Sequence, residues 1–437
     1  MRKIILIILL VSVGLLSLLT PFLFQNSTVE TIQPEFNSAD MAWMLVASAF
    51  VLLMTPGLGF FYGGMVTKKN VISTILQSFI AMVVITVLWF IFGYGLAFGP
   101  DLYGVIGNPI PHLFMKDIGT KTAWAGAPTI PILLFAVFQL KFAIITPALI
   151  SGGWAERVRF WGYLLFIVLF SIFIYSPLAH ATWHPEGILA KWGVLDFAGG
   201  TVVHMSAGWA ALAGAMFLKK RSFPEHKPSR ITYVILGTSL LWFGWFGFNA
   251  GSSFAANELA VQAFANTTAA SAAAALAWGF LEKINGQKLS AMGVCIGAVV
   301  GLVAITPAAG FVTIGHSIFI GIFASLVSSY VVRLRSKVGI DDTLDVFPCH
   351  GVGGIVGMIL TGVFATSEIN AVVTTEGLFY GETALFFKHM IAMVAVSVFA
   401  FVGTWVLLII TNKITPLRVQ PEKESIGLDL SQHGESL

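Results

Sequence analysis

The chain has 437 residues, of which 57% are hydrophobic and only 10% are charged, and its formal net charge is +3. Soluble domains carry about 25% charged residues, so this composition excludes a chain folded around one water-soluble core. Long apolar runs separated by short charged clusters instead predict an all-α integral membrane protein. Helices are expected because lipid offers no hydrogen-bond partners to backbone groups.

The N-terminal end has the charge order of a secretory signal sequence. Arg2 and Lys3 precede an uncharged stretch from Ile4 to Phe24, which predicts a signal peptide over residues 1–27. The apolar core is longer than that of most signal peptides, and no A-x-A site follows it. The sequence therefore predicts the segment but leaves its cleavage open.

Apolar segments long enough to cross a membrane follow in series. The sequence predicts eleven of them, over residues 41–65, 71–98, 129–151, 159–180, 197–218, 231–252, 259–281, 289–306, 310–333, 349–366 and 385–411. Together they define a membrane domain over residues 40–412, which is followed by a tail over residues 413–437.

The distribution of positive charge predicts the orientation. Seventeen of the 24 Lys and Arg residues lie in one alternate set of connections and the tail, whereas four lie in the opposite set. Because positively charged loops stay on the cytoplasmic side, we expect the N-terminus outside, the tail in the cytoplasm, and an odd number of spans in the cell membrane.

Two short segments repeat one pattern. Asp196 and His204 are eight residues apart, as are Asp342 and His350, and a glycine follows each histidine four residues later. The two segments would enter the membrane from opposite sides, as in an inverted repeat whose interface binds substrate near the midplane. A match this short could also arise by chance.

The paired histidines suggest a pore. A histidine within an apolar span is costly to desolvate and usually faces a cavity or the bundle interior. Either His204 or His350 alone would be read as structural, but together they could line a pore and exchange hydrogen bonds or protons. No third metal ligand lies nearby in the sequence, so we expect no metal site.

Aromatic residues recur at helical spacing. Phe138 and Phe142 are four residues apart, as are Phe248 and Ser252, and Trp183 ends the fourth span. Such residues commonly pack, face lipid or anchor a helix at the interface. They could equally form a cation–π site for a small cation. We expect the nearby His180 and His184 to face solvent or headgroups.

Several ordered motifs resemble those of the ammonium transporter family, the Amt/Mep/Rh proteins, and favour its Amt branch. The resemblance runs from about residue 40 to the C-terminus. It rests on Thr55-Pro-Gly-Leu-Gly-Phe-Phe-Tyr-Gly-Gly64, Phe138-Gln-Leu-Lys-Phe142, Ala155-Glu-Arg-Val-Arg-Phe160, Asp196-Phe-Ala-Gly-Gly-Thr-Val-Val-His204, Trp245-Phe-Gly-Phe-Asn-Ala-Gly-Ser252 and Asp345-Val-Phe-Pro-Cys-His-Gly351.

The resemblance implies a homotrimer in which each subunit has a pore between two inverted five-helix repeats, with an eleventh helix packed outside. It implies an external recruitment site of Trp183, Phe142 and Ser252, ordered by Asp196 as a helix cap or a source of negative potential. Phe142 and Phe248, preceded by Phe138, would form a gate. His204 and His350 would line the hydrophobic pore below.

The expected activity is transport of ammonium or ammonia without a cofactor, enzymatic catalysis or a nucleic-acid partner. Deprotonation before the narrow pore would avoid the cost of stripping water from an ion. The proton could return outside or cross through the histidines. The tail resembles the family's regulatory tail, so a PII-type signal protein is an expected partner. The alternative function is an ammonium sensor coupled to such a protein.

Overall fold

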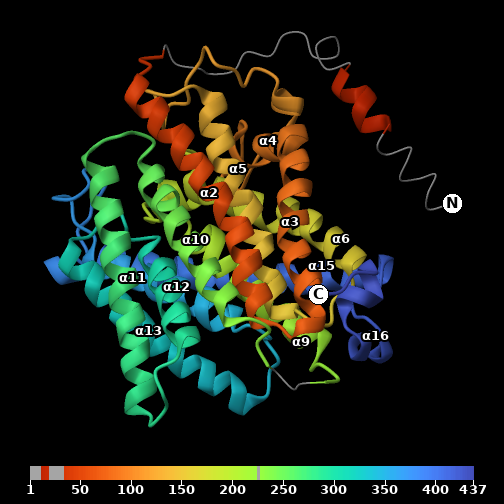
Figure 1. The fold of residues 1–437 in the computed structure, drawn as a ribbon. Helices are drawn as coiled ribbons and strands as arrows, with labels where there is room; N and C mark the ends of the chain where they lie inside the picture. The colour runs from red at the N-terminus through yellow and green to blue at the C-terminus, as the bar shows by residue number, and fades with distance from the viewer. Residues whose placement is uncertain (1–10, 19–33, 224–226) are drawn as a thin grey trace.

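The computed structural model describes residues 11–18, 34–223 and 227–437 (Figure 1). Of the predicted signal peptide over residues 1–27, only a helix at residues 11–18 falls within these ranges, and the rest lies outside the described residues. The regular secondary structure of the described residues is helical apart from one two-stranded hairpin and two isolated β-bridges, so the predicted all-α class is confirmed.

Several long helical segments combine two or more helices of different winding, including short 3-10 and π turns. In chain order, the elements are α2 (Ser38–Met65), η1 (Lys68–Asn70), α3 (Val71–Leu88), η2 (Trp89–Gly93), α4 (Tyr94–Phe98), β1 (Asp101–Leu102), β2 (Ile106–Gly107), η3 (Ile110–Met115), α5 (Ile132–Ile150), η4 (Ser151–Trp154), α6 (Phe160–Phe170), η5 (Ser171–Tyr175), α7 (Ser176–Trp183), α8 (Ile188–Trp192), η6 (Gly200–Met205), α9 (Ser206–Leu218), α10 (Ile231–Ala250), η7 (Gly251–Ser253), α11 (Glu258–Ile284), α12 (Ala291–Ile305), α13 (Ile314–Val338), η8 (Phe347–Val352), α14 (Gly353–Phe364), η9 (Leu378–Tyr380), α15 (Ala384–Ile414), α16 (Pro421–Ile426) and η10 (Asp429–His433).

Ten described helical segments are long and apolar enough to cross a membrane. They correspond to ten of the eleven predicted spans. The eighth prediction, residues 289–306, falls on α12, whose 15 residues give a helix of about 22 Å, shorter than the hydrocarbon layer of about 30 Å. The predicted number of eleven complete spans is therefore not confirmed.

Local sequence explains where several of these helices begin. The side chain of Asn37 accepts hydrogen bonds from the backbone N–H groups of Ala39 and Asp40 at the start of α2. Asn257 and Ser290 cap α11 and α12 in the same way. Such caps satisfy N–H groups that have no partner within the helix, and they therefore fix the first residue of each span.

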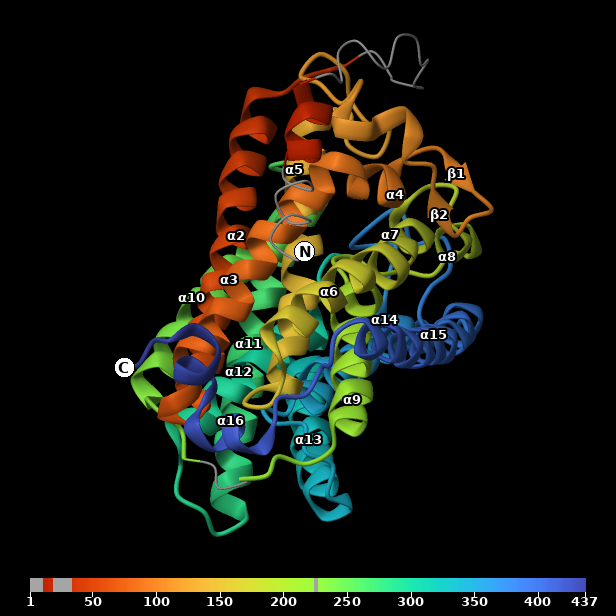
Figure 2. The ribbon, with the colours of Figure 1, turned by 90° about the vertical axis from the view of Figure 1, so that its right-hand side faces the viewer.

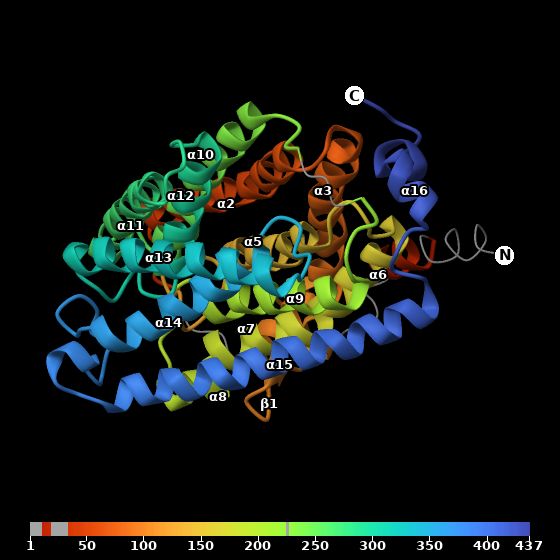
Figure 3. The same ribbon diagram turned by 90° about the horizontal axis from the view of Figure 1, so that it is seen from below.

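The long helices pack side by side as one bundle. α2 lies against α10, and α11, α12 and α13 form a neighbouring group (Figures 1 and 3). α15 runs along the outside of the bundle, against α9 and α14 (Figure 3). Figure 2 shows the β1–β2 hairpin near one end of the bundle, here named the hairpin face, and α16 near the other, named the tail face.

The hairpin packs on the end of α7 through His180. Its ring is fully buried, at 0% exposure, and its Nε2 lies 2.8 Å from Oδ1 of Asp101. His184 stacks on it, with ring centroids 4.3 Å apart. The expectation that His180 faces solvent or headgroups is therefore wrong, because the hairpin covers the position that sequence places at the end of a span.

The C-terminal tail folds back on the loops of the tail face. Glu424 accepts hydrogen bonds from the N–H and Oγ of Ser222, at 2.6 and 3.0 Å. Asp429 accepts from the N–H groups of Ile72 and Ser73, at 3.1 and 2.7 Å, at the start of α3. The tail is thus attached to the membrane domain at two separate places, the loop at Ser222 and the start of α3.

Candidate functional site

A small cavity near the hairpin face collects residues from several helices. Its volume is about 80 Å³, and its lining consists of Trp124, Gln139, Phe142, Trp183, Phe197, Ser252 and Phe254. The three residues predicted to form a recruitment site, Phe142, Trp183 and Ser252, therefore meet at one place. The other four were not predicted, because they come from the connection before α5, from α5 itself and from two later loops.

Two bonds orient the predicted cation-binding groups. The indole Nε1–H of Trp183 donates to the carbonyl of Asp196 at 3.0 Å, and its ring meets Phe142 edge to face at 5.8 Å. The hydroxyl of Ser252 donates to the carbonyl of Phe248 at 2.9 Å. Because its hydrogen is used there, the Ser252 oxygen can accept a hydrogen bond from a ligand.

Gln139 adds a polar group that the sequence interpretation missed. It is 4% exposed, and its Oε1 has no hydrogen-bond partner among the described residues. A buried amide oxygen without a partner is costly, and a ligand with N–H groups would satisfy it. The signal in the sequence was weak, since a single Gln beside Phe138 gives no spacing pattern.

Two phenyl rings lie directly below the cavity. Phe142 and Phe248 are 1% and 0% exposed, and their centroids are 4.2 Å apart with planes 30° from parallel. Phe138 meets Phe142 edge to face at 5.0 Å. The predicted gate residues thus form one contact group, in which Phe142 borders both the cavity and the ring below it.

The predicted histidine pair lies beyond these rings. His204 is 5.9 Å from the ring of Phe248, and its Nδ1 is 3.4 Å from Nδ1 of His350. With both rings neutral, one Nδ1–H can donate to the lone pair of the other. His350 lines a second small cavity toward the tail face, together with Tyr62 and Cys349. The imidazoles therefore lie between the 80 Å³ cavity and this second cavity.

Close backbone packing brings the two histidine segments together. A Cβ atom on Gly208 would lie 2.2 Å from the backbone nitrogen of Gly351, and one on Gly354 would lie 3.2 Å from Cβ of His204. Glycine removes these clashes because it has no side chain. The glycines that follow each histidine in the sequence thus allow the segments to cross in contact.

Asp196 caps the segment that carries His204. Its two carboxylate oxygens accept from the N–H groups of Gly199, Gly200 and Thr201, at 2.8, 2.7 and 2.7 Å, and from the Thr201 hydroxyl at 2.5 Å. Asp196 is not among the residues that line the 80 Å³ cavity. It reaches that cavity only through its carbonyl, which holds Trp183.

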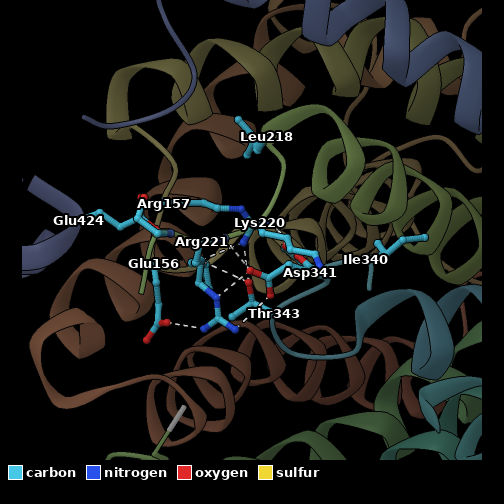
Figure 4. Close-up of polar contacts among 12 residues, drawn as sticks. Glu156, Arg157, Leu218, Lys220, Arg221, Ile340, Asp341, Thr343 and Glu424 are labelled. Atoms are coloured by element: carbon cyan, nitrogen blue, oxygen red, sulfur yellow. Dashed lines mark hydrogen bonds and ion pairs between the residues drawn. The ribbon is translucent and has the colours of Figure 1, made fainter. Parts of the chain in front are cut away.

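Asp342 occupies the corresponding position before His350. Its carboxylate accepts from the N–H groups of Val346 and Phe347, at 3.1 and 2.8 Å. The preceding residue, Asp341, is held by Arg221, whose Nε and Nη2 donate to its two oxygens at 2.9 and 3.0 Å (Figure 4). The start of η8 is thus fixed from the tail face.

Further charged groups complete this tail-face cluster, which we define as Glu156, Arg157, Arg221 and Asp341 (Figure 4). Glu156 accepts from Arg221 at 2.5 Å, and Arg157 donates to the carbonyl of Asp341 at 2.5 Å. Burial alone would raise the pKa of Glu156, but hydrogen bonds from Thr67 and the charge of Arg221 lower it below the usual value. The cluster joins three loops distant in the sequence.

Comparison with known proteins places this geometry in a family. Residues 42–437 match the model of the Ammonium Transporter Family. The chain is similar to an ammonium transporter from Aquifex aeolicus, with 46% identity over 92% of this chain and 94% of that protein.

Solved structures agree. The structure is similar to that of Saccharomyces cerevisiae Mep2, with 35% identity, a TM-score of 0.83 and 89% of each chain covered. It is also similar to a structure described as a sensor Amt protein, with 26% identity, a TM-score of 0.81, and 90% of this chain and 98% of that chain covered. The chain is a multi-pass membrane protein that belongs to the ammonium transporter family.

Proposed function

We propose that the protein binds ammonium at the 80 Å³ cavity, removes a proton there, and conducts ammonia past the phenyl gate and the two histidines. One observation carries this proposal. Neighbouring rings connect Trp183, Phe142, Phe248, His204 and His350 in turn, with centroid distances of 5.8, 4.2, 5.9 and 5.5 Å. They form an aromatic path from the cavity to the centre of the bundle.

Ammonium suits the cavity for chemical reasons. The faces of Trp183 and Phe142 attract a cation, with an energy of about 1–2 kcal/mol when water is excluded. The oxygens of Ser252 and Gln139 can accept its N–H groups. This combination of rings and oxygens recognises a small ion that has four hydrogen-bond donors and a single positive charge.

Deprotonation in the cavity, before the gate, avoids the cost of removing water from an ion. The stacked Phe142 and Phe248 offer no polar group to replace the hydration shell of an ion, whereas neutral ammonia has a much lower cost of transfer. The proton either returns to the hairpin side or moves along the His204–His350 contact. The first route is electrically silent and the second is electrogenic. Potassium is rejected in both, because it has no proton to release.

The proposed assembly follows from the family. We propose a homotrimer in the cell membrane, with one pore per subunit between two inverted five-helix repeats. The hairpin face lies outside and the tail face lies in the cytoplasm, as the positive loops indicate. The matching Asp caps and crossing glycines of the two histidine segments support the inverted repeat.

The test of recruitment is Trp183→Leu. Loss of the cation–π contact costs about 1–2 kcal/mol, so the half-saturation concentration for ammonium rises roughly 5- to 30-fold in proteoliposomes. Ser252→Ala removes one acceptor and should shift half-saturation in the same direction by a similar factor. A Trp183 that only anchors the helix would change the amount of folded protein but not half-saturation. That result would disprove the aromatic part of the site.

A second candidate function is sensing, because the chain resembles the sensor Amt structure and its tail is docked on one loop and on the start of α3. A PII-type protein that binds the tail face would report the state of the pore. Truncation after Pro421 removes Glu424 and Asp429, and it should abolish capture of purified PII protein while ammonium flux remains measurable. Equal capture with and without the tail would contradict this partner. A sensor without transport would give no flux in either form.

A further inference from the structure

The contact between the β1–β2 hairpin and α7 has an unusual proton requirement. Both ring nitrogens of the fully buried His180 face oxygen atoms. Nδ1 lies 2.9 Å from the carbonyl of Ala97, and Nε2 lies 2.8 Å from Oδ1 of Asp101. A carbonyl oxygen can only accept, so Nδ1 must carry a hydrogen.

The second contact then needs another proton. A neutral imidazole with its hydrogen on Nδ1 has a lone pair on Nε2, and an ionised carboxylate oxygen has only lone pairs. At 2.8 Å the two atoms would repel unless a proton lies between them. Oδ1 of Asp101 also accepts from the N–H of Gly104 at 2.7 Å. With Asp101 ionised, Oδ1 accepts both bonds, which places the extra proton on His180.

This contact fixes the end of the helix that carries Trp183. His180 is three residues, or nearly one helical turn, before Trp183 on α7. Beyond α7, the N–H of Ile188 donates to the carbonyl of Gly104 at 2.9 Å, so the hairpin spans the end of the helix. On its other side, α7 is held by the bond from Trp183 to Asp196.

We infer that His180 and Asp101 are positioning residues for ammonium recruitment, joined by a charge-assisted hydrogen bond that holds the end of α7 in place. The inference rests on the proposed recruitment at Trp183. Neither side chain lines the cavity, so the pair acts through the placement of α7 and not through contact with ammonium.

Charged and titratable groups surround the pair. They are His184, stacked on His180, and the ion pair of Glu186, in the loop after α7, with Lys191 on α8. Burial alone would raise the pKa of Asp101, but hydrogen bonds from His180 and Gly104 lower it below the usual value. The carboxylate is therefore ionised, and the hydrogen atom of the contact lies on Nε2 of His180.

The proton can be observed directly. In full-length protein labelled with ¹⁵N-histidine and placed in lipid bilayers, His180 should show two protonated ring nitrogens. The His180→Gln variant identifies its signals by difference. Asp101→Asn, which has the same shape but no charge, should leave only Nδ1 protonated. A singly protonated His180 in the unmodified protein would overturn the inference, whatever the transport data show.

The functional consequence is weaker recruitment when the contact is broken. In proteoliposomes, Asp101→Asn should raise the half-saturation concentration for ammonium about three- to tenfold, while the maximal flux per folded protein changes less than about twofold. His184→Gln is the matched control, because it removes the neighbouring imidazole but keeps the contact, so its half-saturation should not change.

Three outcomes separate the explanations. Unchanged half-saturation in Asp101→Asn, or a loss of maximal flux without a change in half-saturation, would overturn the role in recruitment. A rise in half-saturation in His184→Gln but not in Asp101→Asn would assign the effect to that ring and also overturn it. If Trp183→Leu leaves half-saturation unchanged, the proposed recruitment site fails, but the ¹⁵N measurement still decides whether the pair holds the proton.

Discussion

The segments that carry His204 and His350 begin with similar caps but are anchored differently. At η6, the carboxylate of Asp196 accepts four hydrogen bonds. At η8, Asp342 accepts two, and the neighbouring Asp341 is held by Arg221 in the buried tail-face cluster. One imidazole is positioned by local hydrogen bonds, and the other through ion pairs that join distant loops.

This difference predicts different sensitivity to mutation. A local cap can be lost at the cost of its own hydrogen bonds, about 1–3 kcal/mol. A buried ion pair contributes little net stability when complete, but removal of one partner leaves an uncompensated charge and costs about 3–5 kcal/mol. The tail-face anchor should therefore be the more fragile of the two.

The largest effect is expected for Arg221→Ala. The side chains of Arg221, Glu156 and Asp341 are 7, 5 and 11% exposed, so both carboxylates would be left buried without their main partner. We expect a loss of about 3–5 kcal/mol in the free energy of unfolding, measured on purified protein in detergent.

Arg333→Ala is the matched control, because Arg333 bonds the exposed Asn285 at the surface and should cost less than about 0.5 kcal/mol. Similar losses in both variants would show that the cluster has no special role in anchoring η8.

A smaller effect is expected for Asp196→Ala. The N–H groups of Gly199, Gly200 and Thr201 would lose their acceptor, at a cost of about 2–3 kcal/mol. Trp183 bonds the carbonyl of residue 196 and keeps that bond. Unfolding measurements on Asp196→Ala and Asp196→Asn should therefore show the amide retaining part of the lost stability. A loss larger than that of Arg221→Ala would reverse the proposed order of the two anchors.

The smallest effect concerns pH. Burial alone would raise the pKa values of Glu156 and Asp341. The charge and hydrogen bonds of Arg221 help to lower both pKa values below their usual range. Carboxylates with lowered pKa values stabilise the folded state above their unfolded pKa of about 4 and lose this contribution as the pH falls through the folded values. The stability difference between the unmodified protein and Arg221→Ala should thus be greatest near neutral pH and shrink below about pH 4. A difference that does not vary with pH would exclude the ion pairs as its source.

Sequence reasoning predicted the fold class and most span positions because apolar length is a local property. The site residues Phe142, Trp183 and Ser252 were found through motif resemblance, and the structure brings them to one cavity. Spacing alone could not have joined them, since they lie on three different helical segments. α12 was predicted as a full span over residues 289–306, but the Ser290 cap starts the helix at Ala291, and the helix ends at Ile305.

The tail-face cluster and the His180 contact could not be predicted. Arg221 is 65 residues from Glu156 and 120 from Asp341, and no local periodicity links loops that far apart. His180 was assigned to the interface because sequence shows the end of a helix but not the hairpin folded over it. In both places, the missing information is which loops cover which helix ends.

The π-helical winding of η6 and η8 has a consequence for insertions and deletions. In a π turn, the backbone hydrogen bond joins residues i and i+5, so the turn contains one residue more than an α turn. Each adjacent residue rotates a helix by about 100°, so deletion of one residue between Asp196 and His204 would turn the imidazole away from its partner. The same holds between Asp342 and His350. Gene variants that change the length of these eight-residue intervals, even by one codon, would therefore disrupt the pair more than most substitutions within them.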